Sequence, residues 1–222
     1  GDSNTIMLDL AKRCIGIGKS TPFVAGVAAL DPYRERQDLF ETLEKAGFIG
    51  VVNAPSACID TDFFTGPGGH DIHEAKKMLG VYQDIELIKD AHDYGFFTIG
   101  IVVDEEEVKL MIEAGADAII PHMGFTTGGI NGVPEDLAPT LDEAIEKTQE
   151  LCAYAKSLKP DVFVFAHGGP FNAPGPVGEC FARTDVDGFW GNSAIGRIPT
   201  ENAMINVISQ YTDLERPPKK GR

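Results

Sequence analysis

The stretch PDVFVFAHGGP, residues 160–170, contains five apolar residues in a row, followed by a histidine and two glycines. An unbroken apolar run of this length is typical of a β-strand buried on both faces, as in a parallel sheet covered by helices. In such folds the functional groups gather where the strands end at their carboxyl side. The sequence therefore predicts a functional edge at His167, Gly168 and Gly169, where the glycines would let backbone N–H groups approach a ligand.

Helix, glycine and buried strand follow one another along most of the chain, as a weak internal repeat. Residues 44–48 before one expected strand resemble residues 113–117 before another, and residues 93–96 have the same pattern. This order predicts repeated βα units with parallel strands and right-handed crossovers. The expected strands are residues 22–30, 48–53, 96–103, 117–121, 162–166 and 186–190, and the expected helices are residues 5–17, 34–46, 82–94, 105–113, 141–158 and 200–211, with a short one at 73–78.

The fold class predicted by these units is α/β, a TIM (β/α)8 barrel with about six βα units in this chain. A barrel of eight strands usually takes about 250 residues, whereas the chain has 222. Either the sheet is open, or the first two strands lie before Gly1, on a separate segment or in a partner. We expect a single domain at residues 1–212, a disordered tail at 213–222, and a homo-oligomer, because an incomplete barrel exposes strand edges.

Composition narrows the class of partner. The chain is 43% hydrophobic and 24% charged, with a formal net charge of −15, which argues against nucleic acid or an anionic membrane surface as its main partner. A small anionic metabolite is still compatible with this net charge, because a local group of N–H donors can outweigh the average negative electrostatic field of the protein. No apolar run approaches the length of a transmembrane helix. The four cysteines form no Cys-x-x-Cys pair, which favours a reducing, cytoplasmic compartment and argues against structural zinc.

Several motifs together resemble one family. They are VAGV at 24–27, DPYR at 31–34, AGAD at 114–117, HMGFTTGG at 122–129, HGGP at 167–170 and GFWGNS at 188–193. This set is similar to the phosphoenolpyruvate hydrolase-like TIM-barrel family, which also forms the carboxyl-terminal domain of the plant Tm-1 virus-resistance proteins. The resemblance spans about residues 1–208, with HMGFTTGG as its most specific motif. It implies a barrel whose first two strands are missing from this chain.

The chain departs from the family pattern at three places. KKMLGVY at 76–82 stands where the family carries an ETGMGY-like run, Ala54 replaces a phenylalanine, and GRIP at 196–199 replaces ERLP. The first change removes a carboxylate from a loop expected at the active site. Substrate and activity can therefore differ from those that the family name implies.

His122 and His167 each end an expected strand, on one rim of the barrel. A neutral imidazole is the usual proton shuttle near pH 7, so we predict that the two histidines act as acid and base. The alternative is a histidine that only hydrogen-bonds a loop carbonyl. Asp31 and Asn53 end neighbouring strands. We expect Asp31 either to be catalytic or to cap the next helix, and Asn53 to contact the ligand.

Small and polar residues at the same rim predict an anion site. Glycines in loops are more often simple turns, but here two glycine pairs follow the strand-end histidines. An arginine could pair with a carboxylate or phosphate in a bidentate way, or could be a surface cation. The expected ligand-binding residues are Asn53, Thr126, Thr127, Gly128, Gly129, Gly168, Gly169, Asn192, Ser193 and Arg197, with the loop 124–139 closing over the ligand.

No dense carboxylate motif marks a metal site. Asp104 and Glu105 to Glu107 follow an expected strand, and their commoner role is negative charge at a helix N-terminus. One of them could still join His122 and Asp31 around Mg²⁺ or Mn²⁺, which accept oxygen and imidazole ligands. The sequence leaves open whether the site binds a metal ion, and no other cofactor is expected.

The resemblance and the rim residues together predict a hydrolase or lyase that acts on a small phosphorylated or 2-oxo carboxylate metabolite similar to phosphoenolpyruvate. Retro-aldol cleavage or decarboxylation of a 2-oxo acid is the second enzymatic alternative. The non-enzymatic alternative is a barrel domain that senses a small ligand or binds a protein, as the Tm-1 resemblance allows.

Overall fold

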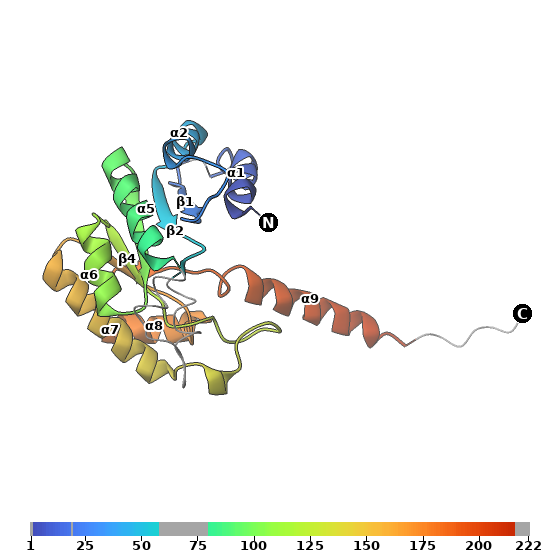
Figure 1. The fold of residues 1–222 in the computed structure, drawn as a ribbon. Coiled ribbons are helices and arrows are strands. Elements are labelled where there is room, and N and C mark those ends of the chain that lie inside the picture. The colour runs from blue at the N-terminus through green and yellow to red at the C-terminus, as the bar shows by residue number, and fades with distance from the viewer. Residues whose placement is uncertain (1, 19, 58–79, 216–222) are drawn as a thin grey trace, which may run out of the picture.

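A parallel sheet forms the centre of the molecule. The computed structural model describes residues 2–18, 20–57 and 80–215. Within these residues six strands lie side by side in chain order, and each pairs in parallel with the next (Figure 1). The strands are β1 (Val24–Val27), β2 (Gly50–Asn53), β3 (Phe97–Val102), β4 (Ala118–Pro121), β5 (Phe163–Ala166) and β6 (Gly188–Phe189). The predicted α/β fold with six βα strands, a partial TIM barrel, is confirmed.

Helices alternate with these strands. They are α1 (Ser3–Cys14), α2 (Arg36–Ala46), α5 (Val81–Tyr94), α6 (Glu105–Glu113), α7 (Leu141–Leu158), α8 (Pro174–Arg183) and α9 (Arg197–Thr212), with a 3-10 turn η1 (Glu135–Leu137). The helix expected at residues 73–78 and most of the KKMLGVY segment lie outside the described residues. No helix in the described part of the chain is long and apolar enough to cross a membrane.

Local sequence signals explain several of the helix ends. Gly47 and Gly95 end α2 and α5 with positive φ angles of 98° and 108°, a conformation that glycine adopts without steric cost. Thr140 and Glu143 form a reciprocal capping box at the start of α7. The repeat of helix, glycine and strand therefore reflects real helix stops.

Helix α8 is an α-helix of the described residues that the sequence prediction missed. Its first turn contains Pro174, Gly175 and Pro176, which indicate a loop when they are considered alone. Proline is nevertheless well suited to the first turn of a helix, because its fixed φ is already helical and its missing N–H would have no partner there. Val177 and Cys180 of this helix are buried, so tertiary packing stabilises a segment of poor helix propensity.

The sheet has a helix-covered outer face and an inner face. Outward residues such as Ile119 and Val164 pack with helix residues, whereas Val52, Ile99, Ile101, Ala118 and Ile120 form a separate inner cluster. The prediction that residues 162–166 are buried on both faces is wrong for the inward residue Phe163, which is about half exposed. The reason is that β1 and β6 remain edge strands of the described sheet, so the inner face is not enclosed by a full ring of strands.

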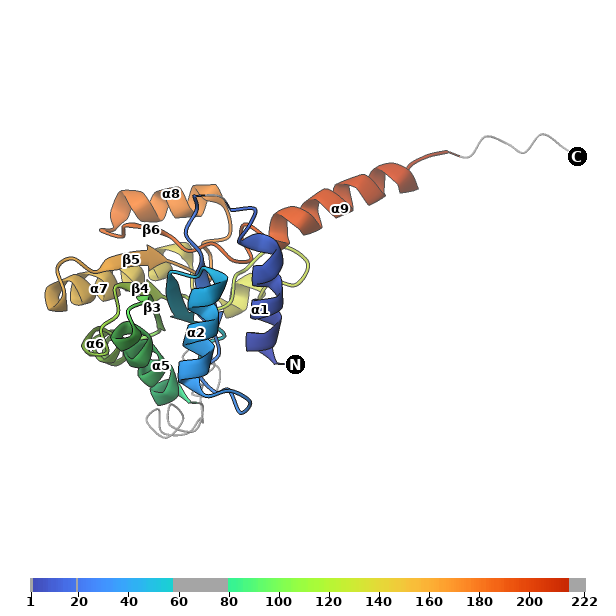
Figure 2. The ribbon, with the colours of Figure 1, turned by 90° about the horizontal axis from the view of Figure 1, so that it is seen from above.

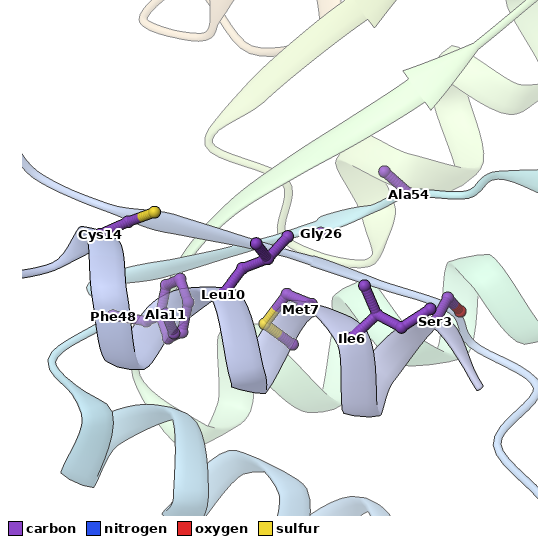
Figure 3. A pocket seen from close by; sticks show the side chains of 9 residues that line it. All are labelled: Ser3, Ile6, Met7, Leu10, Ala11, Cys14, Gly26, Phe48 and Ala54. Carbon is purple, nitrogen blue, oxygen red and sulfur yellow. The ribbon is translucent and has the colours of Figure 1, made fainter. Parts of the chain in front are cut away.

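The sheet is also incompletely covered beside its edge strand β1. Helix α1 and the sheet border an apolar cavity of about 370 Å³ (Figure 3). Ile6 and Leu10 of α1 line it and remain more than half exposed, and Gly26 and Ala54 line it from the sheet side. This side of the molecule therefore presents apolar surface that the described chain does not cover.

Candidate active site

Two histidines lie next to each other where β4 and β5 end. A parallel bridge joins the backbones of His122 and His167, and their ring centroids are 4.9 Å apart with an interplanar angle of 66°. Side chains alternate along a strand, so His122 shares the face of Ile120 and His167 that of Phe165, which is the inner face. Only 6% of His122 and 7% of His167 are exposed. The structure thus brings the two predicted acid–base residues together on one rim.

Hydrogen bonds give the two rings opposite tautomers. The Gly124 N–H donates to Nδ1 of His122 at 3.1 Å, so in the neutral ring the proton is on Nε2. Nδ1 of His167 lies 2.7 Å from the Trp190 carbonyl oxygen. A carbonyl only accepts, so this Nδ1 carries the proton and Nε2 keeps a free lone pair. The pair therefore offers one Nε2–H donor and one Nε2 acceptor.

Burial keeps both imidazoles neutral. It lowers the pKa of His122 to about 3, and the neighbouring His167 contributes to the same direction. Burial also lowers the pKa of His167, although its hydrogen bond to the Trp190 carbonyl acts in the opposite direction. At neutral pH the two rings can act as a hydrogen-bond donor and a base without first losing a proton.

The glycine pair after His167 joins two loops. Gly168 and Gly169 have positive φ angles of 81° and 50°, and a Cβ on either would overlap the carbonyl oxygen of Gly124 or Met123. The Gly169 N–H donates to the Gly124 carbonyl at 2.8 Å, and the Met123 N–H donates to the His167 carbonyl at 3.0 Å. The expectation that Gly169 offers its N–H to a ligand is corrected, because that N–H is already used inside the protein.

The threonines of HMGFTTGG divide into two environments. The Thr127 side chain is buried: its hydroxyl accepts from Asn172 Nδ2 at 2.9 Å, and its N–H donates to the Gly169 carbonyl at 3.0 Å. Thr127 therefore holds the loop in place and does not present its hydroxyl to a ligand. Thr126 is only half-buried. The following glycines have positive φ angles, 80° at Gly128 and 73° at Gly129.

Arg197 reaches this loop from α9. Its guanidinium donates to the Gly128 carbonyl at 3.2 Å and to the Glu201 carboxylate at 3.0 Å. The Glu201 carboxylate also accepts the Ile130 N–H at 2.8 Å. Glu201 was not among the predicted residues, although its spacing of four from Arg197 on a helix was a usable signal. The structure thus shows a carboxylate held by an arginine and a loop N–H at the predicted anion site.

Asn192 and Ser193 lie at the start of the same helix. Their backbone carbonyls accept the N–H groups of Gly196 and Ile198, both at 2.9 Å. The Asn192 side chain is exposed and the Ser193 side chain is half-buried. They remain near Arg197, on the loop after β6.

Asp31 belongs to a different cluster. Its carboxylate accepts from the Asn4 amide at 2.9 Å, from the Tyr33 N–H at 2.9 Å and from Arg34 at 2.8 Å. Burial opposes ionisation, but these hydrogen bonds outweigh it and lower the pKa of Asp31. The carboxylate is thus held ionised by residues around the start of α1. It neither lies with the histidines nor caps α2, whose first residue is Arg36.

Asn53 is also placed away from the rim. Its side chain is fully buried, donates to Asp84 of α5 at 3.1 Å and accepts the Ile101 N–H at 2.7 Å. It shares the outer face with Val51, so it ties β2 to β3 and α5. The expectation that Asn53 contacts a ligand is corrected: a polar residue at a strand end points outward or inward according to its register.

Metal ligands are not gathered among the described residues. Within residues 2–18, 20–57 and 80–215 no group of three or more His, Cys, Asp or Glu side chains could hold an ion. Asp104 caps α6 by accepting the Glu107 N–H at 2.9 Å, which is the helix N-terminal role. The described donor set therefore does not fit the Mg²⁺ or Mn²⁺ site considered from the sequence.

Comparison with known proteins identifies the family of the chain. Two tomato (Solanum lycopersicum) proteins, ToMV susceptible protein tm-1(GCR26) and ToMV resistance protein Tm-1(GCR237), are each 33% identical over 214 residues. The match covers 96% of the chain but only 27% of either tomato protein. Among solved structures, FabK from Thermotoga maritima is similar with a TM-score of 0.48 and 16% identity, covering 82% of this chain and 45% of FabK. The profile of the phosphoenolpyruvate hydrolase-like family matches residues 1–214, so the chain belongs to that family.

Proposed function

We propose that the rim formed by the ends of β4 and β5 catalyses proton transfer on a small carboxylate-bearing metabolite similar to phosphoenolpyruvate, in a hydrolase or lyase reaction. The observation that carries the proposal is the His122–His167 pair, buried on one face with complementary Nε2 atoms. A base and a neutral donor side by side are what enol and oxo-acid chemistry needs, because a proton is removed while charge develops on an oxygen.

The two rings would have distinct roles. His167 Nε2, with its lone pair, takes the proton from the attacking water or from the substrate. His122 Nε2–H hydrogen-bonds the oxygen on which negative charge develops. In hydrolysis of an enol phosphate, water attacks phosphorus, its proton passes to His167, and the P–O bond to the enol oxygen breaks as His122 hydrogen-bonds that oxygen. The His122 pKa of about 3 suits a neutral donor rather than an imidazolium acid.

The anion would be held at Arg197. In the structure the guanidinium and the Ile130 N–H already hold a carboxylate, that of Glu201. We infer that a substrate carboxylate or phosphate replaces Glu201 there, since arginine pairs with either group in the same fork geometry. The Thr127–Gly169 contact joins this loop to the one that bears His167, so the anion site and the histidines belong to one connected rim.

Thermal shift followed by turnover tests the proposal. The wild type is mixed with phosphoenolpyruvate, pyruvate or oxaloacetate, with and without Mg²⁺, and product is then assayed. We expect His167→Asn, which can still donate to the Trp190 carbonyl, to lower turnover by about 10²–10⁴-fold. His92→Asn, an exposed histidine on α5, is the matched control and should retain activity. Full turnover by His167→Asn would refute the assignment.

Arg197 is tested by binding. Arg197→Ala should weaken binding of the ligand that shifts the wild type. Glu201→Gln should strengthen it several-fold, because the competing internal charge is removed while a side chain of the same shape remains. Equal affinity in the wild type and both variants would remove Arg197 from the site.

A non-catalytic binding domain is the second candidate. One observation favours it: several rim donors, including the N–H groups of Gly124 and Gly169, are already paired within the protein. A ligand that shifts the melting temperature with no turnover under any condition would select this alternative. The name of the tomato resistance protein is compatible with a domain that recognises a partner.

A further inference from the structure

The loop after β4 contains an asparagine that is followed directly by a glycine. Asn131 and Gly132 lie in a bend between Thr127 and Val133, which are joined by a bridge. Asn131 is exposed, and among the described residues neither its side-chain amide nor the Gly132 N–H has a hydrogen-bond partner. The two groups are therefore free to react with each other, because no hydrogen bond has to break first.

We propose that Asn131 is a site of spontaneous deamidation in the folded protein. The Gly132 nitrogen attacks the side-chain carbonyl carbon of Asn131 and loses its proton to water as the new C–N bond forms. The C–N bond of the side-chain amide then breaks, and ammonia leaves after taking up a proton from water. Water opens the resulting cyclic imide at either carbonyl and leaves aspartate or isoaspartate. Glycine favours the attack because it has no side chain to crowd the nitrogen.

The fold requires a glycine at position 132. A Cβ there would overlap the backbone nitrogen and carbonyl oxygen of Gly128. This close approach places Gly132 against the part of the loop that Arg197 contacts, since the guanidinium donates to the Gly128 carbonyl at 3.2 Å. The residue that makes Asn131 reactive is thus fixed by the packing of the loop.

Deamidation would alter the loop that α9 holds. Figure 2 shows that α9 extends away from the rest of the molecule, and its first turns contact this loop. Ile130, the residue before Asn131, donates its N–H to Glu201 at 2.8 Å. Either product adds a negative charge beside this contact, and isoaspartate also adds a carbon atom to the main chain where Gly132 packs on Gly128. The reaction should therefore loosen the contact between the loop and α9.

Mass spectrometry of digested protein, after several weeks at physiological temperature and neutral pH, measures the modification directly. Isoaspartate is identified by its methylation with an isoaspartyl methyltransferase. Asn206 is the internal control, because it is also exposed but precedes Val207, whose N–H is bonded within α9. We expect Asn131 to be converted at least about tenfold faster than Asn206. A smaller ratio would overturn the proposal, and so would a rate in the folded protein more than about tenfold below that in guanidinium, because the fold would then protect Asn131.

Hydrogen exchange tests the effect on the loop without any ligand. Aged wild type should exchange the Ile130 N–H several-fold faster than fresh protein. Asn131→Gln, whose longer side chain forms the corresponding ring poorly, is the matched control and should not change with age. Unchanged exchange in deamidated wild type would refute the loosening of the loop.

An effect on the anion rests on the proposed function, and it is measured separately. Asn131→Asp reproduces one product and should weaken binding of the anion several-fold, because it adds negative charge near Arg197. Equal affinity of this variant and the wild type would contradict the electrostatic effect. The mass and exchange measurements need no ligand, so they decide the deamidation even if the anion site fails.

Discussion

The loops that follow β4 and β5 hold each other through backbone hydrogen bonds, whereas α1 and α9 leave apolar side chains exposed. The Met123 N–H of the first loop donates to the His167 carbonyl, and the Gly169 N–H of the second loop donates to the Gly124 carbonyl. On α9, the apolar side chains of Met204, Val207, Ile208 and Tyr211 remain between 49% and 72% exposed. Both regions flank one sheet, yet the described residues satisfy the polar groups of the first and leave the apolar side chains of the second exposed.

The difference shows where the described chain determines its own structure. Polar backbone groups are costly to bury without partners, so loops that satisfy one another adopt a single arrangement and hold His122 and His167 in register. Exposed apolar side chains cost less and are available for association. We therefore expect substitutions between the two loops to have the largest effects on stability, and those at the exposed residues of α9 to have smaller ones.

Gly169→Ala should give the largest loss of stability. The added Cβ would overlap the Met123 carbonyl, and φ is positive at this position. Strain and overlap together are expected to cost about 2–4 kcal/mol. Gly175→Ala is the matched control, because a Cβ there meets no atom within 4 Å and the residue lies in α8. Urea unfolding monitored by circular dichroism measures both, and equal stability of the two variants would contradict the role given to the loop contact.

The pH dependence of stability should report the buried histidine. His122 has a pKa of about 3 in the folded protein against an ordinary value of 6.5, so between these values the unfolded chain binds a proton that the native protein does not. Stability is therefore fully present above about pH 6.5 and falls as the pH decreases, by up to about 1.4 kcal/mol per pH unit. His122→Asn, whose side-chain oxygen can still accept the Gly124 N–H, should flatten this slope between pH 6 and 4. Parallel slopes for wild type and variant would show that His122 is not buried as a neutral ring.

Much of the fold could be predicted because its signals are local. Gly47 and Gly95 stop helices that the apolar spacing had already indicated, and apolar segments in the repeated βα pattern predicted all six described strands. The two histidines were found because each directly follows an apolar strand segment.

The direction in which a side chain points was not a local signal. Asn53 and Asp31 stand at strand ends like the histidines, but register turns Asn53 toward α5. Asp31 is bound by Asn4, 27 residues away in the sequence, and by its neighbour Arg34. Glu201 was missed because its contact with the Ile130 N–H joins α9 to a loop 71 residues earlier in the chain, and this contact depends on the tertiary structure.

The polar cluster around Asp31 should have the smallest of these effects, and it tests how α1 is attached to the molecule. Because the apolar face of α1 is only partly covered, Asp31 and Asn4 supply a polar attachment at its first turn. Asp31→Asn keeps the shape of the side chain but places an amide nitrogen either at Oδ2, to which Asn4 and Arg34 both donate, or at Oδ1, to which the Tyr33 N–H donates. We expect a loss of about 1–3 kcal/mol and faster hydrogen exchange in α1 than in α7. Asp9→Asn breaks an ion pair on α1 whose partners are both well exposed, and it should leave stability and exchange unchanged. If both variants exchange α1 at the wild-type rate, the helix is held by its apolar side alone, and the contrast between the two regions is smaller than the hydrogen bonds imply.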